Sequence, residues 1–223
     1  TYLYEEETRR TKYLNDIFET LILRDIIQKY KIRNAPLLEK ITDYLMDNVS
    51  NIVSSNKMAD TLTANKIKAS DKTVSAYISY LCNAVGFYRI RRYYIRGKRY
   101  LASNDKYYLA DPAFRSARLG NRNPDYGRIS ENLVAMELLR RGYEVYAGVL
   151  YKKEIDFVAM RRDEKIYIQV SEFIDNPDTF EREYSPLLAI KDAYPKMILA
   201  RTRQQTYQYE GIIIKDIAEW MCE

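Results

Sequence analysis

Apolar positions recur every three or four residues in the first part of the chain, a spacing that predicts amphipathic helices. One helix is expected over about residues 14–30, and a second begins near Pro36, because Pro is favoured at the start of a helix. A third helix follows Ser70 or Asp71, either of which can cap it. Its apolar stripe consists of Val74, Tyr77, Ile78, Leu81 and Val85.

Short apolar runs replace this spacing beyond Gly142, the residue that ends a predicted helix over residues 129–142. Runs rich in Val, Ile, Tyr and Phe are typical of strands. They lie at residues 143–149, 154–160, 165–171, 197–200 and 211–215. Further helices are expected at about residues 178–194 and 216–223. This order predicts a mixed sheet covered by helices, and hence an α+β or α/β fold.

A helix-turn-helix pattern precedes this second part. A short helix can begin at Ser54 or Ser55, and a turn over residues 63–70 separates it from the helix that follows Ser70. A hairpin around Gly97 and Lys98 comes next, and this order is typical of a winged helix-turn-helix. We therefore expect three parts, which are a helical winged helix-turn-helix domain over residues 1–110, a connector over 111–127 and an α/β domain over 128–223.

The positive charge of the chain is concentrated in this helix-turn-helix and hairpin. The whole chain has a formal charge of +5, whereas residues 50–106 hold eleven Lys or Arg and three Asp, a net +8. Such a local excess is typical of a surface that binds a polyanion, and double-stranded DNA is the expected partner. The residues expected to contact it are Lys72, Thr73, Ser75 and Ser79 on the helix and Arg91, Arg92, Arg96, Lys98 and Arg99 on the hairpin. The alternative is a solvated basic face on a domain that contacts proteins.

Several chemistries are excluded by what the sequence lacks. The chain has no His, so it has no Ser-His-Asp triad and no His metal ligand. Its seven Gly residues form no phosphate-binding loop. Cys82 and Cys222 lack a metal-ligand spacing, and we expect reduced thiols in a cytoplasmic protein. No apolar run reaches the roughly 20 residues of a membrane span, and the charged start does not resemble a signal peptide, so no membrane partner is expected.

Polar residues inside two neighbouring strand runs indicate a candidate metal site. Asp156 lies between two apolar residues, and Gln169 lies in the next run. If these runs form a hairpin, both side chains come close together, and Glu131 can approach them from the preceding helix. Oxygen ligands of this kind hold Mg²⁺, which activates water against a phosphodiester. The alternative is that Asp156 is a structural acid and that Glu131 stabilises the start of its helix.

These residues resemble a known core. The order Glu131, Asp156 and Gln169-Val170-Ser171 resembles that of the PD-(D/E)XK nuclease superfamily. Nearly the whole chain also resembles the C-terminal half of prokaryotic AAA-superfamily ATP-binding proteins that end in the region called DUF 4143. The resembling segments are LILRDIIQKYKIRN, SDKTVSAYISYL, GRISENLVAMELLRRGYEVYAG, KEIDFVA and IYIQVS. The resemblance implies a winged helix joined to a nuclease-like (restriction-endonuclease-like) domain, with the family's ATPase domain, absent from this chain, as partner.

Two positions depart from the nuclease pattern. Active members carry an acid, one residue and then Lys on the third core strand, where this chain has Gln169 and Ser171. Gln offers a cation only a neutral carbonyl, and Ser does not replace an ammonium group. Loss of one preorganised charged group costs roughly 10²–10³ in rate. Lys153 or Lys165 could replace the Lys in space, and Glu154 could supply a carboxylate.

We therefore expect a DNA-binding module of an AAA-type ATPase with a degenerate nuclease-like domain and without an ATPase site of its own. The first alternative is a Mg²⁺-dependent nuclease that uses Glu131, Asp156 and Gln169, with Glu131 and Asp156 as metal ligands. The second is a protein-interaction or assembly domain. No pattern in the sequence indicates the DNA target or the oligomeric state.

Overall fold

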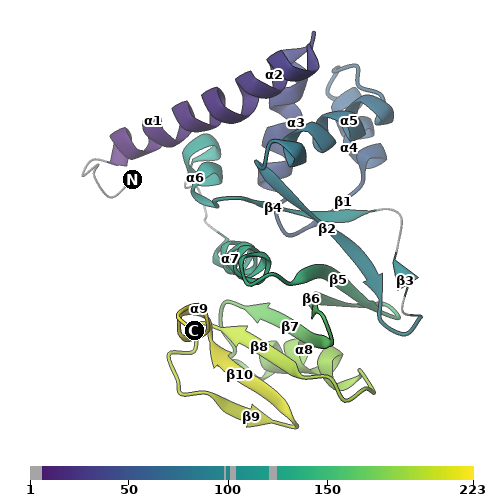
Figure 1. The fold of residues 1–223 in the computed structure, drawn as a ribbon, viewed down its shortest axis with the longest axis vertical. Coiled ribbons are helices and arrows are strands. Elements are labelled where there is room, and N and C mark those ends of the chain that lie inside the picture. The colour runs from purple at the N-terminus through teal and green to yellow at the C-terminus, as the bar shows by residue number, and fades with distance from the viewer. Residues whose placement is uncertain (1–6, 98, 101–103, 121–124) are drawn as a thin grey trace. The chain divides into compact units, whose positions relative to one another are not determined.

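The computed structural model describes residues 7–97, 99–100, 104–120 and 125–223 (Figure 1). The chain forms two compact units, of which the first comprises Thr1–Arg89 with Asn104–Pro124 and the second Ile90–Ser103 with Asp125–Glu223. It first passes from one unit to the other within strand β2 (Phe87–Tyr94). Helices and a mixed sheet make up the fold, which confirms the predicted α/β character at that level.

Helices dominate the first unit and begin where the sequence provides caps. They are α1 (Glu7–Ile17), the π-helical segment η1 (Phe18–Arg24), α2 (Asp25–Tyr30), α3 (Ala35–Asp47), α4 (Ser55–Ala64), α5 (Asp71–Asn83) and α6 (Ala113–Leu119). Asn34, Ser54 and Ser70 accept hydrogen bonds from backbone N–H groups in the first turns of α3, α4 and α5. The caps at Ser54 and Ser70 are among those predicted, whereas α6 lies inside the segment predicted to be a connector.

Short strands complete the first unit. β1 (Ile52–Val53) pairs antiparallel with β4 (Asp105–Leu109), and β4 is next to β2 in the strand order. Neither strand is predicted from the sequence, because β1 has two residues and β4 is buried on both faces and therefore shows no alternation. The buried core includes Phe18, Leu23, Ile26, Leu38, Ile41, Leu45, Met58, Val74, Ile78 and Leu81. Val85, predicted to belong to this core, is exposed because α5 ends at Asn83.

A mixed sheet organises the second unit (Figure 1). Besides the end of β2, its strands are β3 (Arg99–Tyr100), β5 (Glu144–Leu150), β6 (Lys153–Arg161), β7 (Glu164–Ser171), β8 (Lys196–Ala200), β9 (Tyr207–Tyr209) and β10 (Ile212–Asp216). β2 pairs with β5, β7 with β8 and β8 with β10 in parallel, whereas the other pairs are antiparallel. Each strand run predicted beyond Gly142 corresponds to one of these strands, and β9 is additional.

The helices of the second unit pack on this sheet. They are α7 (Tyr126–Arg140), α8 (Pro177–Leu188) and α9 (Ile217–Met221). Leu187 of α8 is buried in one cluster with Tyr167 and Val158 from the sheet, whereas α7 contacts α9 as well as β5 and β7. α8 ends earlier than the predicted Tyr194, because residues 189–195 form the connection to β8. Among the described residues, no helix has the length and apolar character of a bilayer span.

The basic hairpin belongs to the second unit from residue 90 onward, and not to the predicted winged helix-turn-helix domain. Tyr93 and Ile95 are buried in the core of the second unit, and the Ile95 N–H donates to the Val149 carbonyl at 3.0 Å. These two apolar residues hold the hairpin against the sheet of the second unit. The sequence predicts the hairpin but not the parallel pairing of β2 with β5.

Candidate functional site

The outer surface of α5 carries small polar side chains and one cation. Lys72 and Ser75 are exposed, whereas Thr73 and Ser79 are half-buried. The Thr73 hydroxyl lies 2.9 Å from the hydroxyl of the cap residue Ser70, so it is already engaged at the start of the helix. On the opposite side of α5, Val74, Ile78 and Leu81 of the predicted apolar stripe are buried, whereas Tyr77 is half-buried.

Aromatic contacts hold α5 against α2 and fix the direction of its polar side. The rings of Tyr30 and Tyr80 are stacked with centroids 3.7 Å apart and an interplanar angle of 10°. The Asn83 side-chain amide donates to the Tyr30 hydroxyl at 3.3 Å. These contacts occupy one flank of α5, while Lys72 and Ser75 face solvent.

Arg89, absent from the predicted contact residues, lies beside this helix within the first unit. Its Nη2 donates to Ser79 Oγ at 3.3 Å, and Ser79 Oγ donates to the Ser75 carbonyl at 2.9 Å. We call the surface formed by Lys72, Ser75, Ser79 and Arg89 the α5 face. The sequence offered no signal to separate Arg89 from the other arginines of the hairpin, because only the fold assigns it to the first unit.

Arg89 is also held from its other side. Its Nε lies 3.7 Å from Asp105 Oδ2 of β4, and its guanidinium centre lies 5.8 Å from the centroid of the Tyr107 ring. The Arg89 guanidinium also lies near Cys82 of α5. Burial raises the pKa of the Cys82 thiol to about 11, and the positive charge of Arg89 opposes this rise. Cys82 is therefore predominantly a neutral thiol at pH 7.

The predicted hairpin contacts all fall in residues 90–103, and thus in the second unit; they are Arg91, Arg92, Arg96, Lys98 and Arg99. Arg91 is exposed in β2, and the exposed Arg96 donates to the Tyr151 hydroxyl at 2.5 Å while it lies over the same ring. Arg92 is half-buried. Lys98 lies outside the described residues, and Arg99 belongs to β3.

A cavity of about 470 Å³ in the second unit brings together two of the predicted site residues. Glu131 of α7 and Asp156 of β6 both line it. Its other charged lining residues are Asp125, Arg128, Glu172, Arg182 and Glu183. The sequence analysis missed Arg182 and Glu183, because they lie on α8 in a helical segment without a recognisable motif.

Asp156 and Gln169 are neighbours, as predicted, and the side chain of each accepts a hydrogen bond from the backbone of the other's strand. The Asp156 N–H donates to Gln169 Oε1 at 2.7 Å, and the Val170 N–H donates to Asp156 Oδ2 at 2.9 Å. The regular backbone pairing of β6 with β7 begins at Phe157 and Ile168. The two side-chain hydrogen bonds therefore connect the strands just beyond the end of the backbone pairing. Both polar groups therefore satisfy backbone N–H groups that would otherwise lose their partners.

The Gln169 amide continues this network into α8. Its Nε2 donates to Glu183 Oε2 at 3.1 Å, and Glu183 Oε1 accepts hydrogen bonds from Arg182 at 2.8 and 3.0 Å. Gln169 and Glu183 are both buried, with 6% and 7% of their surface exposed. An acid in place of Gln169 would set two carboxylates against each other, so the amide fits this position better than the acid of an active nuclease.

No lysine takes the position that the nuclease pattern requires. The Ser171 hydroxyl donates to the Phe173 carbonyl at 3.0 Å. Lys153 Nζ donates to Ser185 Oγ at 3.2 Å, and Lys165 Nζ lies over the Tyr194 ring, 4.6 Å from its centroid. Neither lysine lines the cavity, and the cations that do, Arg128 and Arg182, are paired with Asp125 and Glu183.

The residues present do not fit a divalent metal. Within the described residues, no group of three or more acidic or Cys side chains is arranged to hold a metal ion. Of the carboxylates that line the cavity, Asp125, Glu172 and Glu183 form ion pairs with arginines, and Asp156 accepts a backbone hydrogen bond; Glu154 does not line the cavity. Mg²⁺ requires near-octahedral oxygen ligation, so the cavity offers it a poor ligand set.

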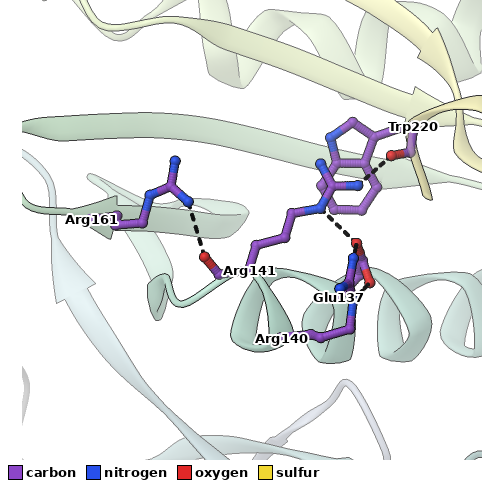
Figure 2. Close-up of polar contacts among 5 residues, drawn as sticks. All are labelled: Glu137, Arg140, Arg141, Arg161 and Trp220. Carbon is purple, nitrogen blue, oxygen red and sulfur yellow. Dashed lines mark hydrogen bonds and ion pairs between the residues drawn. The ribbon is translucent and has the colours of Figure 1, made fainter. Parts of the chain in front are cut away.

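The far end of α7, the helix that carries Glu131, is fixed by a buried carboxylate (Figure 2). Glu137 accepts two hydrogen bonds from Arg140, at 2.6 and 2.7 Å, and one from Arg141 at 2.6 Å. These arginines, Arg140 foremost, lower the pKa of Glu137 to about 2. Arg141 also lies 4.2 Å from the Trp220 ring centroid and donates to the Trp220 carbonyl, which joins α7 to α9.

Comparison with known proteins finds a family that matches the first half of the chain. The sequence model of that family, described as a domain of unknown function (DUF8612), matches residues 1–125, just over half of the chain. No solved structure matches the chain.

Two curated proteins are similar over nearly the full chain. An uncharacterized protein of Haemophilus influenzae is 35% identical over 218 residues, which cover 98% of this chain and 54% of that protein. An uncharacterized protein of Methanocaldococcus jannaschii is 27% identical over 214 residues, which cover 94% of this chain and 47% of that protein. The chain thus spans about half the length of the curated relatives it matches.

Proposed function

This chain belongs to the DUF8612 family, and we propose that it binds double-stranded DNA through the α5 face. We also propose that the second unit has a PD-(D/E)XK nuclease-like fold whose cavity does not cleave DNA. The observation that carries the proposal is the helix pair α4 and α5, in which α5 is held by aromatic contacts on one flank and presents the exposed Lys72 and Ser75 on the other, with Arg89 beside them.

The order of elements in the first unit supports a winged helix-turn-helix. α3, β1, α4, α5 and the first residues of β2 follow in this order, and β4 comes after the hairpin; α4 and α5 are the helix pair, and β1 is antiparallel to β4. In a helix-turn-helix the second helix lies in the major groove, and its first residues contact base edges or phosphates. Lys72 and Ser75 occupy the first turns of α5, which suits this role.

The charge of the helix pair supports a nucleic-acid partner. Its exposed cations are Lys57, Lys66, Lys68 and Lys72, and its exposed acids are Asp60 and Asp71. Phosphate contacts by such cations release counterions and supply affinity without base specificity. We propose that the exposed Arg91 and Arg96 add backbone contacts from the second unit, together with the predicted Arg92, Lys98 and Arg99.

The cavity residues of the second unit argue against cleavage. Gln169 holds β6 and α8 together, and Ser171 lacks the charge of the lysine found in active nucleases. A Mg²⁺-dependent nuclease remains the second candidate, because Glu131 and Asp156 line one cavity. Supercoiled plasmid incubated with Mg²⁺ or Mn²⁺ separates the two. We expect equal, background nicking by the wild type and by Asp156→Ala, and faster nicking by the wild type alone would establish the nuclease.

About half the length of the curated relatives has no counterpart in this chain. We propose that this part of the relatives carries the ATPase domain implied by the sequence resemblance, and that the present chain corresponds to the DNA-binding module of such an ATPase. DNA-stimulated phosphate release from ATP by the complete Haemophilus influenzae relative would support this. Absence of ATP hydrolysis in that protein, with DNA binding retained, would exclude it.

Binding to duplex DNA is tested with a charge reversal on the α5 face. Fluorescence anisotropy with a labelled duplex of about 20 base pairs gives the Kd, and Lys72→Glu is expected to raise it at least about tenfold. The control is Lys40→Glu, which makes the same charge change at an exposed position on α3. Equal Kd values for both variants would remove the α5 face from the interface. If the wild type does not bind, a protein-interaction or assembly domain becomes the better account.

A further inference from the structure

We propose that Arg89 binds a DNA phosphate on the α5 face. In the protein without DNA the anionic neighbour of Arg89 is Asp105, and the bound phosphate replaces Asp105 as the partner of the guanidinium. The inference rests on the proposed DNA binding and names the group and the ligand atoms that the α5 face uses. It extends the set of contacts predicted from the sequence, in which Arg89 had no place.

The Arg89 guanidinium is held by neighbours within the first unit and stays partly open to solvent. It packs over Tyr107 and donates to Ser79 Oγ, which in turn is bonded to the backbone of α5. It also lies beside the Cys82 thiol and the Tyr107 hydroxyl, and it acts on the pKa of both groups in the lowering direction, against the effect of burial. A guanidinium has five N–H donors, and because 31% of the Arg89 side chain is exposed, a further oxygen ligand can approach it from solvent.

The contact with Asp105 is loose. Arg89 Nε and Asp105 Oδ2 are 3.7 Å apart, which is longer than the 2.7–2.9 Å typical of a charge-assisted hydrogen bond. The Arg89 side chain is 31% exposed, whereas that of Asp105 is 14% exposed. A phosphate that approaches from solvent can thus reach the cation without displacing the acid from its own position.

A phosphate is the ligand that fits these donors. The planar fork of Arg matches two oxygens of a phosphate, and Ser75 and Lys72 add a hydroxyl and an ammonium group on the same helix side. Since phosphate carries no sequence information, the contribution of Arg89 is expected to be the same for duplexes of different sequence.

The first test compares Arg89→Ala with Arg24→Ala, which removes an exposed arginine from η1 in the same unit. Kd is measured by anisotropy on two duplexes of unrelated sequence at several salt concentrations. Arg89→Ala is expected to raise Kd about tenfold on both duplexes and to reduce the slope of log Kd against log salt by about 0.9, whereas Arg24→Ala leaves both values unchanged. Arg89→Lys should keep the slope and lose part of the affinity, because it retains the charge without the fork.

The second test addresses Asp105 with a matched control. Asp105→Asn is expected to tighten binding several-fold, because the competing acid is gone, whereas Asp60→Asn makes the same charge change at an exposed position on α4 and should have a smaller effect. In the Arg89→Ala background, Asp105→Asn should give no gain beyond that of Asp60→Asn. Thermal unfolding by circular dichroism confirms that each variant is folded.

The outcomes separate the two proposals. A wild type that does not bind DNA overturns the proposed function and this inference together. A wild type that binds, with Arg89→Ala equal to Arg24→Ala, overturns the inference alone. A loss confined to one of the two duplexes would assign Arg89 to a base instead of a phosphate, and equal effects of Asp105→Asn and Asp60→Asn would remove the role of Asp105.

Discussion

The α5 face and the cavity of the second unit use polar residues in opposite ways. On the α5 face, Lys72 and Ser75 are exposed, and the partly exposed Arg89 lies beside them. In the cavity wall, Asp156 and Gln169 satisfy backbone N–H groups and connect two strands with α8. The first arrangement leaves polar groups open to a ligand, whereas in the second the polar groups form hydrogen bonds within the protein. Similar residue types can therefore indicate binding in one place and stability in another.

Replacement of Glu137 should give the largest change in stability among the polar residues that serve the fold of the second unit. Its buried carboxylate accepts three hydrogen bonds from arginines, so Glu137→Gln removes the charged partner of Arg140 and of the largely buried Arg141 and should cost about 3 kcal/mol in the free energy of unfolding. Urea unfolding followed by the fluorescence of Trp220, the single Trp, measures this value. Glu164→Gln, at an exposed ion pair with Arg161, is the control and should have a smaller effect.

The stability that Glu137 contributes should depend on pH. The pKa of Glu137 is lowered from 4.5 to about 2 in the folded protein, so its stabilisation is present above pH 4.5 and is lost as the pH falls from about 4.5 to 2. The stability difference between the wild type and Glu137→Gln should shrink across this window. A constant difference from pH 7 to pH 3 would contradict the assignment.

Gln169→Ala should have the next largest effect. It removes the acceptor of the Asp156 N–H and the donor to the buried Glu183, and we expect a loss of about 2 kcal/mol. Gln169→Glu is the informative second variant. If Gln169 were a relic of a metal site, the acid would create Mg²⁺-dependent stabilisation in thermal unfolding. If it is a structural amide, the acid destabilises the second unit with or without Mg²⁺.

Asp156→Asn should cost less, about 1 kcal/mol, because the Asn carbonyl can still accept from the Val170 N–H. Asp156→Ala removes the acceptor and should cost more. The two variants are compared by urea unfolding, with the fluorescence of Trp220 as the probe. Equal losses would show that the hydrogen bond to Val170 contributes little.

The α5 face should show the smallest changes in stability. Lys72→Ala and Ser75→Ala are expected to shift the free energy of unfolding by less than about 0.5 kcal/mol, because both side chains are exposed. Their DNA affinity, in contrast, should fall. A large loss of stability in either variant would show that the α5 face serves the fold and would weaken the comparison.

Local patterns predicted the elements well and their partners poorly. Ser70 and the apolar stripe specify α5, and the runs around Asp156 and Gln169 specify a hairpin that brings the two side chains together. The parallel pairing of β2 with β5 joins segments about fifty residues apart, and no periodicity encodes such a partner. For the same reason, the fold alone shows that Arg89 of β2 lies beside α5 in the first unit, while the arginines from residue 91 onward belong to the second unit.

The salt dependence of DNA binding by the unmodified chain tests the central claim most directly. The Kd for a duplex of about 20 base pairs is measured between 50 and 300 mM salt, and the account predicts that log Kd rises with log salt with a slope of about 2–4, as expected for two to four phosphate contacts. Binding that is absent, or a slope near zero, would contradict it.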